Sequence, residues 1–261
     1  MTGGQIDGKV AVVTGGSSGL GACISRALAG HGAHVVVVAR DPQRIEPTVY
    51  ALRTVNPHRS ALGVRADVRR EQDVERMVVN VLEQFKRIDV LIACAGIGRG
   101  STQQVRLVPA PVARLGVDEW QAIIDTNLTG VFLTNRSVLR HMLPRHEGEI
   151  VNVVSARAGV VGQPYAAAYS ASKFAVRALS SALADQVAPY GVRVQSLFPD
   201  AVETPLIAGQ PLARLALPGA RVAELICHML SLPRDASLTS PVVARFGTPP
   251  TTSPLAACAT P

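Results

Sequence analysis

The sequence lacks the signatures of a secreted, membrane-spanning or metal-binding protein. Its four cysteines form no CxxC pair and its six histidines form no HExxH motif, so we predict neither a disulfide framework nor a metal site. The longest apolar runs, such as residues 35–39 and 90–95, fall well short of the ~18 residues that a membrane span requires. The amino-terminal stretch MTGGQIDGKV has neither a basic nor an apolar signal region. We therefore expect a cytoplasmic protein that contacts no membrane.

Aromatic residues are also scarce, at 4% of the chain, which matters when we ask whether the positive charge indicates nucleic-acid binding. The formal net charge is +7, but the arginines are spread from Arg26 to Arg245 and form no basic stripe. Proteins that bind nucleic acid gather their basic residues on one face or along one element. We therefore expect no nucleic-acid partner, and a surface charge that attracts anionic cofactors and substrates.

The sequence does contain a regular alternation of two hydrophobic patterns. Short β-branched runs alternate with longer segments of helical periodicity, and nearly continuous apolar strands separated by helices are typical of a parallel sheet covered on both faces. The predicted fold class is therefore α/β, with a doubly wound parallel sheet. The expected strands are residues 10–14, 34–39, 61–65, 90–93, 150–154, 192–197 and 242–246, and the first expected helices are residues 20–29, 42–55 and 71–86.

Length and composition indicate one domain. With 261 residues, 48% of them hydrophobic, the chain can bury one large core, and no linker interrupts it. We expect this single domain over residues 1–246. Residues 98–116 lack periodicity and predict a long loop, whereas residues 247–261, rich in Thr, Pro and Ala, predict a flexible tail.

A glycine-rich turn joins the first predicted strand to the first predicted helix. It reads TGGSSGLG from Thr14 to Gly21. Glycines permit a tight turn and let the backbone approach a pyrophosphate, whose charge the helix N-terminus stabilises. Between a strand and a helix of a βαβ chain, such a turn predicts a dinucleotide site. Its residues would be Gly15, Ser17, Ser18, Gly19, Leu20 and Gly21.

The residues after the second strand bear on which dinucleotide binds. An acidic side chain there bonds the ribose 2′-hydroxyl of NAD, whereas an arginine accommodates the 2′-phosphate of NADP. Asp41 precedes Pro42 and is better explained as a helix N-cap, which leaves Arg40 to meet a phosphate. The sequence thus favours NADP(H) over NAD(H), with Arg40 lying in solvent as the alternative. Asp67 and Val68, after the third strand, are expected beside the adenine ring.

Tyr169 and Lys173 lie one helical turn apart, so both side chains share one helix face. A tyrosine pKa is near ~10, and proton exchange at neutral pH requires a nearby positive charge that favours the phenolate. Lys173 can supply that charge. Taken alone, the pair is more typical of a half-buried tyrosine beside a lysine whose stem covers apolar surface.

The order of these motifs resembles that of the short-chain dehydrogenase/reductase family. The glycine turn, Asn127 within NLTG, Ser155 after a strand, and Tyr169 with Lys173 follow one another as they do there. The resemblance covers residues 7 to about 205 well and points to the ketoacyl-reductase or alcohol-dehydrogenase type. It implies a single Rossmann-like domain and an oxidoreductase that transfers a hydride between a nicotinamide cofactor and a carbonyl or secondary alcohol.

The resemblance also implies a role for each matching residue. Tyr169 would be the general acid in reduction and the base in oxidation, while Lys173 would lower the phenol pKa and bond the nicotinamide ribose. Ser155 would donate a hydrogen bond to the developing oxyanion, and Asn127 would hold a water that links Lys173 to solvent. The cofactor contacts carried over in the same way are Ala95, Gly96, Val202 and Thr204.

Four departures from the family pattern stand out. Residues 93–96 read ACAG where the family usually has NNAG, and Asp200 replaces the glycine of a Pro-Gly pair, where a positive φ would strain it. The family serine usually lies 13 positions before the tyrosine, where this chain has Ala156. We assign the role to Ser155, because loops absorb insertions more readily than strands change register. The last departure is the length of residues 98–116.

The resemblance extends to the substrate and to self-association. Residues 206–218 lie where the family has a mobile substrate lid, and their apolar content favours an apolar or ring-bearing ketone. Arg157 and Tyr165 flank the reacting residues and are either substrate contacts or ordinary loop residues. Family members are usually homodimers or homotetramers, paired through the helices that correspond here to residues 120–142 and 169–190.

Two other functions stay open from sequence. Residues 93–96 and Asp200 are compatible with a catalytically weak dinucleotide-binding sensor or subunit of the same fold. The same site residues also serve enzymes that epimerise or dehydrate their substrates.

Overall fold

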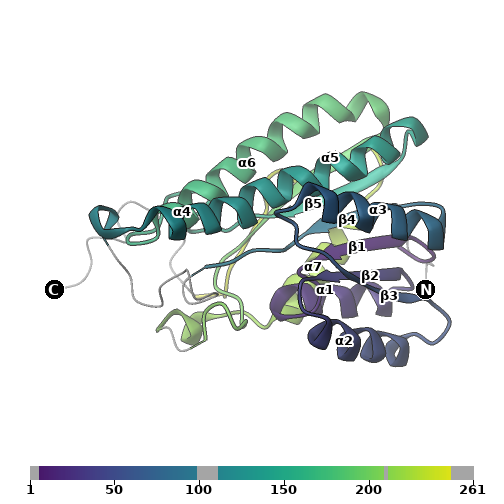
Figure 1. Cartoon of the computed structure of the whole chain (residues 1–261), viewed down its shortest axis with the longest axis horizontal. Helices are drawn as coiled ribbons and strands as arrows, with labels where there is room; N and C mark the ends of the chain where they lie inside the picture. Colours follow the sequence, from purple (N-terminus) through teal and green to yellow (C-terminus); the bar gives the residue numbers. More distant parts are fainter. Residues whose placement is uncertain (1–5, 99–110, 209–210, 248–261) are drawn as a thin grey trace.

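The computed structural model describes residues 6–98, 111–208 and 211–247, whose backbone is organised around a parallel sheet (Figure 1). Seven strands lie in the order β3-β2-β1-β4-β5-β6-β7, and each neighbouring pair is parallel. The predicted doubly wound α/β fold is therefore confirmed. The strands are β1 (Val10–Thr14), β2 (His34–Ala39), β3 (Ala61–Arg65), β4 (Val90–Ala93), β5 (Gly148–Val153), β6 (Val192–Pro199) and β7 (Val242–Val243).

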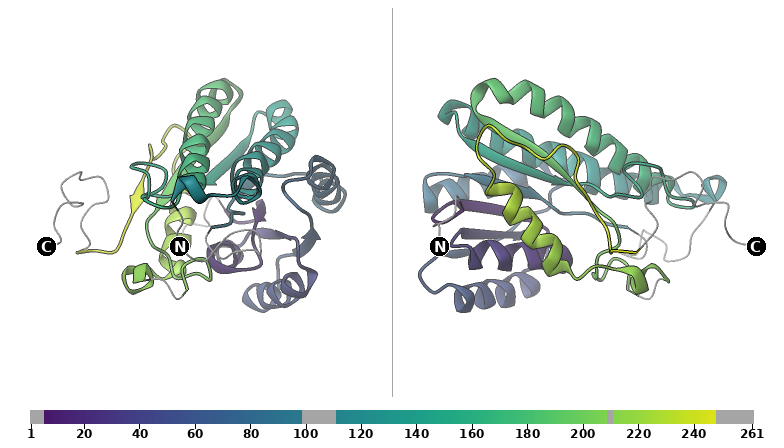
Figure 2. Two further views of the ribbon diagram at one scale, coloured as in Figure 1. Left: turned by 60° about the vertical axis from the view of Figure 1, so that its left-hand side comes forward. Right: turned by 180° about the vertical axis from the view of Figure 1, so that it is seen from behind.

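Helices cover both faces of the sheet (Figures 1 and 2). One face carries α1, α2 and α7, and α1 packs against both of the others. The other face carries α3, α5 and α6, with α4 leading into α5. The helices are α1 (Gly19–Gly30), α2 (Pro42–Val55), α3 (Glu71–Phe85), α4 (Val117–Ile124), α5 (Gly130–Met142), α6 (Ala167–Val187) and α7 (Gly219–Leu230).

The valine runs of the central strands build a core on each side of the sheet. Successive side chains of a strand point to opposite faces. Val13 and Val37 therefore belong to the core under α1 and α7, whereas Val12 and Val36 belong to the core under α3 and α5. All four side chains are fully buried, and burying a valine contributes about 1.5–3 kcal/mol. This two-sided burial explains why β1 is apolar from Val10 to Val13 and β2 from Val35 to Ala39.

The structure corrects several predicted boundaries. The predicted helix over residues 120–142 is interrupted, because residues Asp125–Thr129 form a π-helical turn between α4 and α5. The last strand contains only Val242–Val243. Of the predicted loop, residues 111–116 are described and include a short 3-10 helix, Val112–Arg114. Residues 99–110 and the predicted tail from residue 248 lie outside the described residues.

Asp89 is a buried carboxylate at the amino-terminal edge of the sheet, immediately before β4. It accepts hydrogen bonds from the backbone N–H of Val10 at 2.9 Å, from Arg87 Nε at 2.7 Å and from Arg145 Nη2 at 2.9 Å. Burial raises the pKa of this carboxyl, but these hydrogen bonds outweigh burial and hold the pKa below its ordinary value. The carboxylate thus ties β1 and β4 to the segment before β5.

We predict that Asp89→Asn lowers the free energy of unfolding by about 2 kcal/mol, because an amide offers the two arginines no charge. Since the folded pKa of Asp89 is lowered, its contribution is fully present above the unfolded value near ~4 and is lost as the pH falls through the folded pKa. Urea unfolding at pH 7 and pH 3.5 measures the difference, which should shrink at the lower pH.

Glu224→Gln is the matched control, because Glu224 pairs with His31 at the surface and should change stability by no more than ~0.5 kcal/mol. An Asp89→Asn protein as stable as the wild type at pH 7 would contradict the prediction.

Candidate active site

A cavity of about 520 Å³ opens at the carboxyl edge of the sheet. Its walls come from the segments that follow β1, β2, β4, β5 and β6, which the parallel sheet brings to one edge. β1 lies between β2 and β4, so successive crossovers run in opposite directions from this point of the sheet. In open α/β sheets, ligands bind in the crevice at such a reversal.

The glycine turn after β1 brings three backbone segments into direct contact. A Cβ atom on Gly15, whose φ is +69°, would lie 2.9 Å from Cα of Ala95. A Cβ atom on Gly21 would lie 2.2 Å from the carbonyl oxygen of Gly15. Ser18 is the N-cap of α1 but makes no side-chain capping bond, and the following three residues line the cavity. The first turn of α1 therefore fits a phosphate group, which needs close backbone approach and amide donors.

Thr14 links this turn to the loop after β4, where the ACAG sequence departs from the family pattern. Its Oγ1 accepts hydrogen bonds from the backbone N–H groups of Cys94 at 3.1 Å and Ala95 at 3.2 Å. The loop is thus held through its backbone, although it lacks the two asparagine side chains that the family usually has there. Burial raises the pKa of the Cys94 thiol to about 11, so this side chain is a neutral wall of the cavity at neutral pH.

Two arginines line the end of the cavity that follows β2. Arg40 comes directly after the strand, and Arg44 lies on the first turn of α2. Asp41 between them caps α2 as predicted, since its carboxylate accepts a hydrogen bond from the backbone N–H of Gln43 at 3.0 Å. Arg44 was not predicted from the sequence. Its position three residues after the cap Asp41 is the signal that could have found it.

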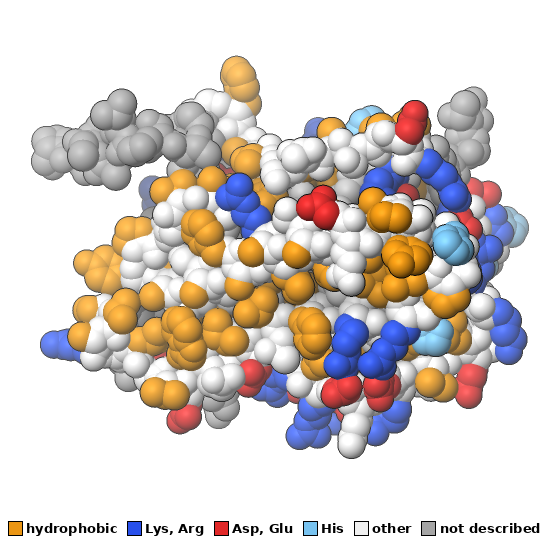
Figure 3. Space-filling model, turned by 90° about the horizontal axis from the view of Figure 1, so that it is seen from above, with side chains coloured by type: hydrophobic (Ala, Val, Ile, Leu, Met, Phe, Trp, Pro, Cys, Tyr) orange, Lys and Arg blue, Asp and Glu red, His pale blue; other side chains and the backbone are white. Residues whose placement is uncertain are grey.

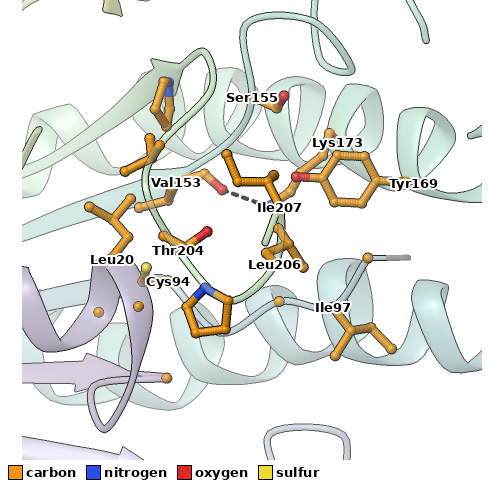
Figure 4. A pocket seen from close by; sticks show the side chains of 18 of the residues that line it. Leu20, Cys94, Ile97, Val153, Ser155, Tyr169, Lys173, Thr204, Leu206 and Ile207 are labelled. Carbon is orange, nitrogen blue, oxygen red and sulfur yellow. Dashed lines mark hydrogen bonds between the residues drawn. The ribbon is translucent and has the colours of Figure 1, made fainter. Parts of the chain in front are cut away.

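Tyr169 and Lys173 lie on α6 and both line the cavity (Figure 4). The Lys173 ammonium donates a hydrogen bond to the carbonyl of Val153 at 2.9 Å and lies 5.8 Å from the centre of the Tyr169 ring. Burial lowers the pKa of Lys173 to about 8. Burial also raises the pKa of Tyr169 to about 12, although the Ser155 hydroxyl opposes this shift. We expected Lys173 to lower the phenol pKa, but desolvation dominates in this structure.

Ser155 faces the cavity two residues after β5, whereas Ala156 is fully buried. Ala156 donates its backbone N–H to the carbonyl of Pro199 at 2.9 Å, which continues the pairing of β5 with β6. The Ser155 Oγ accepts a hydrogen bond from the backbone N–H of Ala158 at 3.3 Å. Its hydroxyl proton is not used in that bond and is directed toward Tyr169, whose pKa the Ser155 hydroxyl lowers against burial, so a substrate oxygen beside Tyr169 can accept it.

Asn127 lies behind the cavity wall, in the π-helical turn, and is fully buried. Its amide exchanges two hydrogen bonds with the backbone of Ile97, at 2.8 and 2.9 Å, and donates a third to Ser172 Oγ at 3.2 Å. Ser172 in turn donates to the carbonyl of Tyr169 at 2.7 Å. Asn127 thus connects the loop after β4 to the helix that carries Tyr169 and Lys173.

The cavity brings most of the predicted site residues together. Those that line it are Gly15, Ser18, Gly19, Leu20, Gly21, Arg40, Gly96, Ser155, Tyr169, Lys173, Val202 and Thr204. Ser17, Asp67, Val68, Ala95 and Asn127 are not among its lining residues. Asp67, which we expect beside the adenine ring, accepts a hydrogen bond from Arg69 Nη2 at 2.6 Å.

The segment after β6 covers the front of the cavity. Leu206 and Ile207 lie across its opening between Thr204 and Tyr169 (Figure 4). Arg157 also lines the cavity, whereas Tyr165 is 62% exposed and does not. Lining residues that were not predicted from the sequence include Arg44, Ile97 and Gln163, whereas Cys94 and Asp200 were noted there only as departures from the family pattern.

The described residues contain no cluster of His, Cys, Asp or Glu that could hold a metal ion, and none of their helices is long and apolar enough to cross a membrane. The cavity combines a glycine turn suited to a phosphate with a tyrosine, a serine and a lysine. This combination defines a dinucleotide-binding oxidoreductase of the α/β class.

Comparison with known proteins identifies the family. The family model described as short chain dehydrogenase matches residues 9–213. The chain is 39% identical over 235 residues to a cis-4-hydroxycyclohexanecarboxylate dehydrogenase of Sinomonas cyclohexanicum, across 85% of this chain and 89% of that protein. The chain therefore belongs to the short-chain dehydrogenase family and is an NAD(P)-dependent oxidoreductase.

Solved structures agree with this family assignment. A 3-ketoacyl-(acyl-carrier-protein) reductase from Brucella melitensis, complexed with NADH, is 31% identical with a TM-score of 0.81, covering 91% of this chain and 97% of that one. An alcohol dehydrogenase from the archaeon Thermococcus sibiricus, complexed with 5-hydroxy-NADP, is 29% identical with a TM-score of 0.82, covering 94% and 99%.

The pKa of Lys173 can be measured directly, because the chain contains only three lysines: Lys9, Lys86 and Lys173. We predict that the Lys173 amine titrates near pH 8, since its charged form is desolvated. Carbon NMR of protein labelled at lysine Cε would show three signals, and Lys173→Arg assigns the one that disappears. The exposed Lys86 gives the reference signal. A Lys173 signal with no inflection below pH 10 would contradict the burial argument.

Proposed function

We propose that this protein is an NADP(H)-dependent reductase of ketones, and in reverse a secondary alcohol dehydrogenase. The observation that carries the proposal is one continuous cavity with Tyr169, Ser155 and Lys173 at one end and Arg40 with Arg44 at the other. A nicotinamide dinucleotide has its reactive ring at one end and its adenosine phosphate at the other. The ring would lie at the end with Tyr169, and the phosphate at the end with Arg40. The glycine turn between them fits the pyrophosphate.

The bound nicotinamide supplies the hydride for reduction and accepts it in oxidation. Tyr169 keeps its proton at neutral pH, because burial raises its pKa to about 12, and it therefore acts as the general acid toward the carbonyl oxygen. The available hydroxyl proton of Ser155 stabilises the oxygen as negative charge develops on it. In oxidation Tyr169 first gives up its proton, and the resulting phenolate then receives the alcohol proton.

Lys173 supports Tyr169 by supplying a positive charge when it is protonated. Its ammonium is fixed by the Val153 carbonyl, and in the proposed role it also bonds the nicotinamide ribose. Asn127 would hold a water molecule that links Lys173 to solvent. The amide is held by Ile97 and Ser172, so its position relative to α6 is constrained.

Arg40 and Arg44 support NADP(H) as the preferred cofactor, with NAD(H) as the weaker alternative. Both arginines line the cavity after β2, where the 2′ position of the adenosine ribose would lie. The carboxylate of Asp41, which could otherwise bond a free 2′-hydroxyl, is engaged as the cap of α2. Two guanidinium groups match the charge of a phosphate better than that of a neutral ribose.

We call the end of the cavity that contains Tyr169, Ser155 and Lys173 the reacting end, and the end with Arg40 and Arg44 the adenosine end. The lining of the reacting end supports an apolar or ring-bearing ketone as the substrate. Its covering segment contributes Leu206 and Ile207, and Ile97 adds a third aliphatic side chain. Pockets of this kind select by shape and apolar contact around a few polar groups. The Sinomonas relative is named for a substrate with a six-membered ring that carries a secondary alcohol, which agrees with this class.

The layer of α4, α5 and α6 supports assembly into a homodimer or homotetramer. Figure 3 views this side of the molecule from above and shows hydrophobic side chains gathered on it. Trp120, Phe132 and Phe174 are each at least 38% exposed there. The small exposed residues Ala171 and Ala178 on α6 would let a second copy approach closely.

Tyr169→Phe should reduce ketone turnover with NADPH at least 100-fold while NADPH binding is retained, because only the proton donor is removed. Absorbance at 340 nm follows turnover across a ketone panel, and fluorescence titration follows binding. Tyr165→Phe is the matched control and should leave both unchanged, since Tyr165 lies outside the cavity. Unchanged turnover in Tyr169→Phe would refute the proposed chemistry. Wild-type protein that binds NADPH but reduces no ketone would favour the sensor.

Arg40→Ala and Arg44→Ala should each weaken NADPH binding by roughly 10-fold or more while changing NADH binding little, because each removes a charge-assisted hydrogen bond to the 2′-phosphate. Titration of both cofactors into each variant measures this ratio. The exposed Arg26, which lies outside the cavity, provides the control Arg26→Ala. Equal losses for NADPH and NADH would contradict the assignment of these arginines.

A further inference from the structure

Arg157 and Asp200 join the two neighbouring loops that follow β5 and β6 at the reacting end of the cavity. Arg157 lies two residues after Ser155, and Asp200 lies directly after β6. Arg157 Nε donates to one oxygen of Asp200 at 2.6 Å, and Nη2 donates to the other at 3.2 Å. The Asp200 side chain is only 5% exposed, and both residues line the cavity. This is a partly buried, two-bond ion pair two residues from the proposed oxyanion donor.

The backbone at Asp200 does not explain why an aspartate stands there. Asp200 does not have a positive φ, so the strain expected from replacing a glycine is absent. Its backbone N–H donates to the carbonyl of Val243 at 2.8 Å, which any residue except proline could do. What distinguishes the aspartate is its carboxylate, and that carboxylate is used to hold Arg157.

Asp200 engages one edge of the Arg157 guanidinium and leaves another facing away from it. A guanidinium offers two edges that match a carboxylate, one formed by Nε and Nη2 and one formed by Nη1 and Nη2. Asp200 takes the first edge. The Arg157 side chain is 31% exposed in the cavity wall, so the group is accessible to a ligand. The arrangement holds an arginine in one orientation before a ligand arrives, which lowers the entropy cost of binding.

The charge balance of the cavity also favours an anion. Among its described lining residues Asp200 is the one carboxylate, whereas Arg40, Arg44, Arg157 and Lys173 are cationic. The first two lie at the adenosine end, which leaves Arg157 and Lys173 against Asp200 at the reacting end. A carboxylate on the outer edge of Arg157 would lie closer to the guanidinium than to Asp200, so attraction exceeds repulsion.

We propose that Arg157, oriented by Asp200, binds a carboxylate of the substrate, so that the substrate is a keto acid or hydroxy acid. The identification of this ligand as the substrate rests on the proposed reductase function. An apolar body would lie against Ile97, Leu206 and Ile207, with the reacting carbonyl toward Tyr169 and the carboxylate toward Arg157. Arg157 is thus a specificity-determining residue, and Asp200 positions it.

Binding can be tested without turnover. Calorimetry would compare cyclohexanecarboxylate with its neutral analogue cyclohexanecarboxamide, both with and without saturating NADP⁺. We expect the wild type to bind the carboxylate roughly 10-fold or more tightly than the amide, as a charge-assisted bidentate contact predicts. Arg157→Gln should abolish this preference and leave the amide affinity unchanged. Equal affinity of the wild type for both compounds would overturn the proposal.

Two further variants keep the test interpretable. Arg157→Gln leaves the buried Asp200 carboxylate without its partner, which can destabilise the fold, so the double variant Arg157→Gln/Asp200→Asn removes both charges together. It should fold and also lose the carboxylate preference. Arg26→Gln removes one positive charge at the exposed surface outside the cavity and should retain the preference. Loss of the preference in Arg26→Gln would assign it to overall charge and overturn the role of Arg157.

Turnover separates this proposal from the proposed function. The substrates are 4-oxocyclohexanecarboxylate and its methyl ester, which differ in charge but share the ring ketone. Arg157→Gln and the double variant Arg157→Gln/Asp200→Asn should each lower the ratio of kcat/KM for the acid to kcat/KM for the ester at least 10-fold, mainly through the KM of the acid. An equal loss for acid and ester would mean that Arg157 is merely structural, and reduction of the ester would still support the ketoreductase. Reduction of neither compound, together with failure to bind NADPH, would count against the proposed function instead.

Discussion

Parallel pairing of the strands is the constraint on which the site depends. Because all strands of the sheet run in one direction, the residues that follow them gather at a single edge, even when they are far apart in the sequence. The valines of β1 and β2 secure this alignment by filling cores on both faces, so a shift in register would expose or misplace many apolar side chains. The glycine turn, Arg40, Ser155 and Asp200 owe their common location to this alignment and not to any local motif.

Desolvation sets the chemical character of the reacting end. Burial disfavours charge on either partner, so it raises the pKa of Tyr169 and lowers that of Lys173. A phenol that keeps its proton is suited to donate it to a carbonyl oxygen. The lysine is held by the Val153 carbonyl in a site that only weakly favours its charge, so its protonation state is sensitive to any anion that enters the cavity.

Much of the fold and part of the site could be predicted from the sequence, because their signals are local. The valine run of β2 and the Asp41 cap of α2 are properties of short segments, and both elements have their predicted bounds. The π-helical turn around Asn127 could not be predicted, since it depends on how α4 and α5 meet the loop after β4. The pKa of Tyr169 depends likewise on burial by distant segments, which the spacing of Tyr169 and Lys173 in the sequence does not reveal.

Asp200, a departure from the family pattern at the cavity wall, illustrates how separation in the sequence hides the function of a residue. From the sequence, Asp200 predicted only backbone strain, because an aspartate stands where a glycine is usual. Its partner Arg157 lies 43 residues away in the chain, so the sequence did not indicate the ion pair. Parallel pairing of β5 and β6 brings the two loops together, and the backbone bond between Ala156 and Pro199 fixes their spacing. The contact with Arg157 explains the aspartate at this position, because its carboxylate orients Arg157 in a wall that also carries Ser155. A pocket with few, fixed polar groups selects ligands by charge and shape, and here the loop that carries Ser155 also carries the cation Arg157, which Asp200 holds in place.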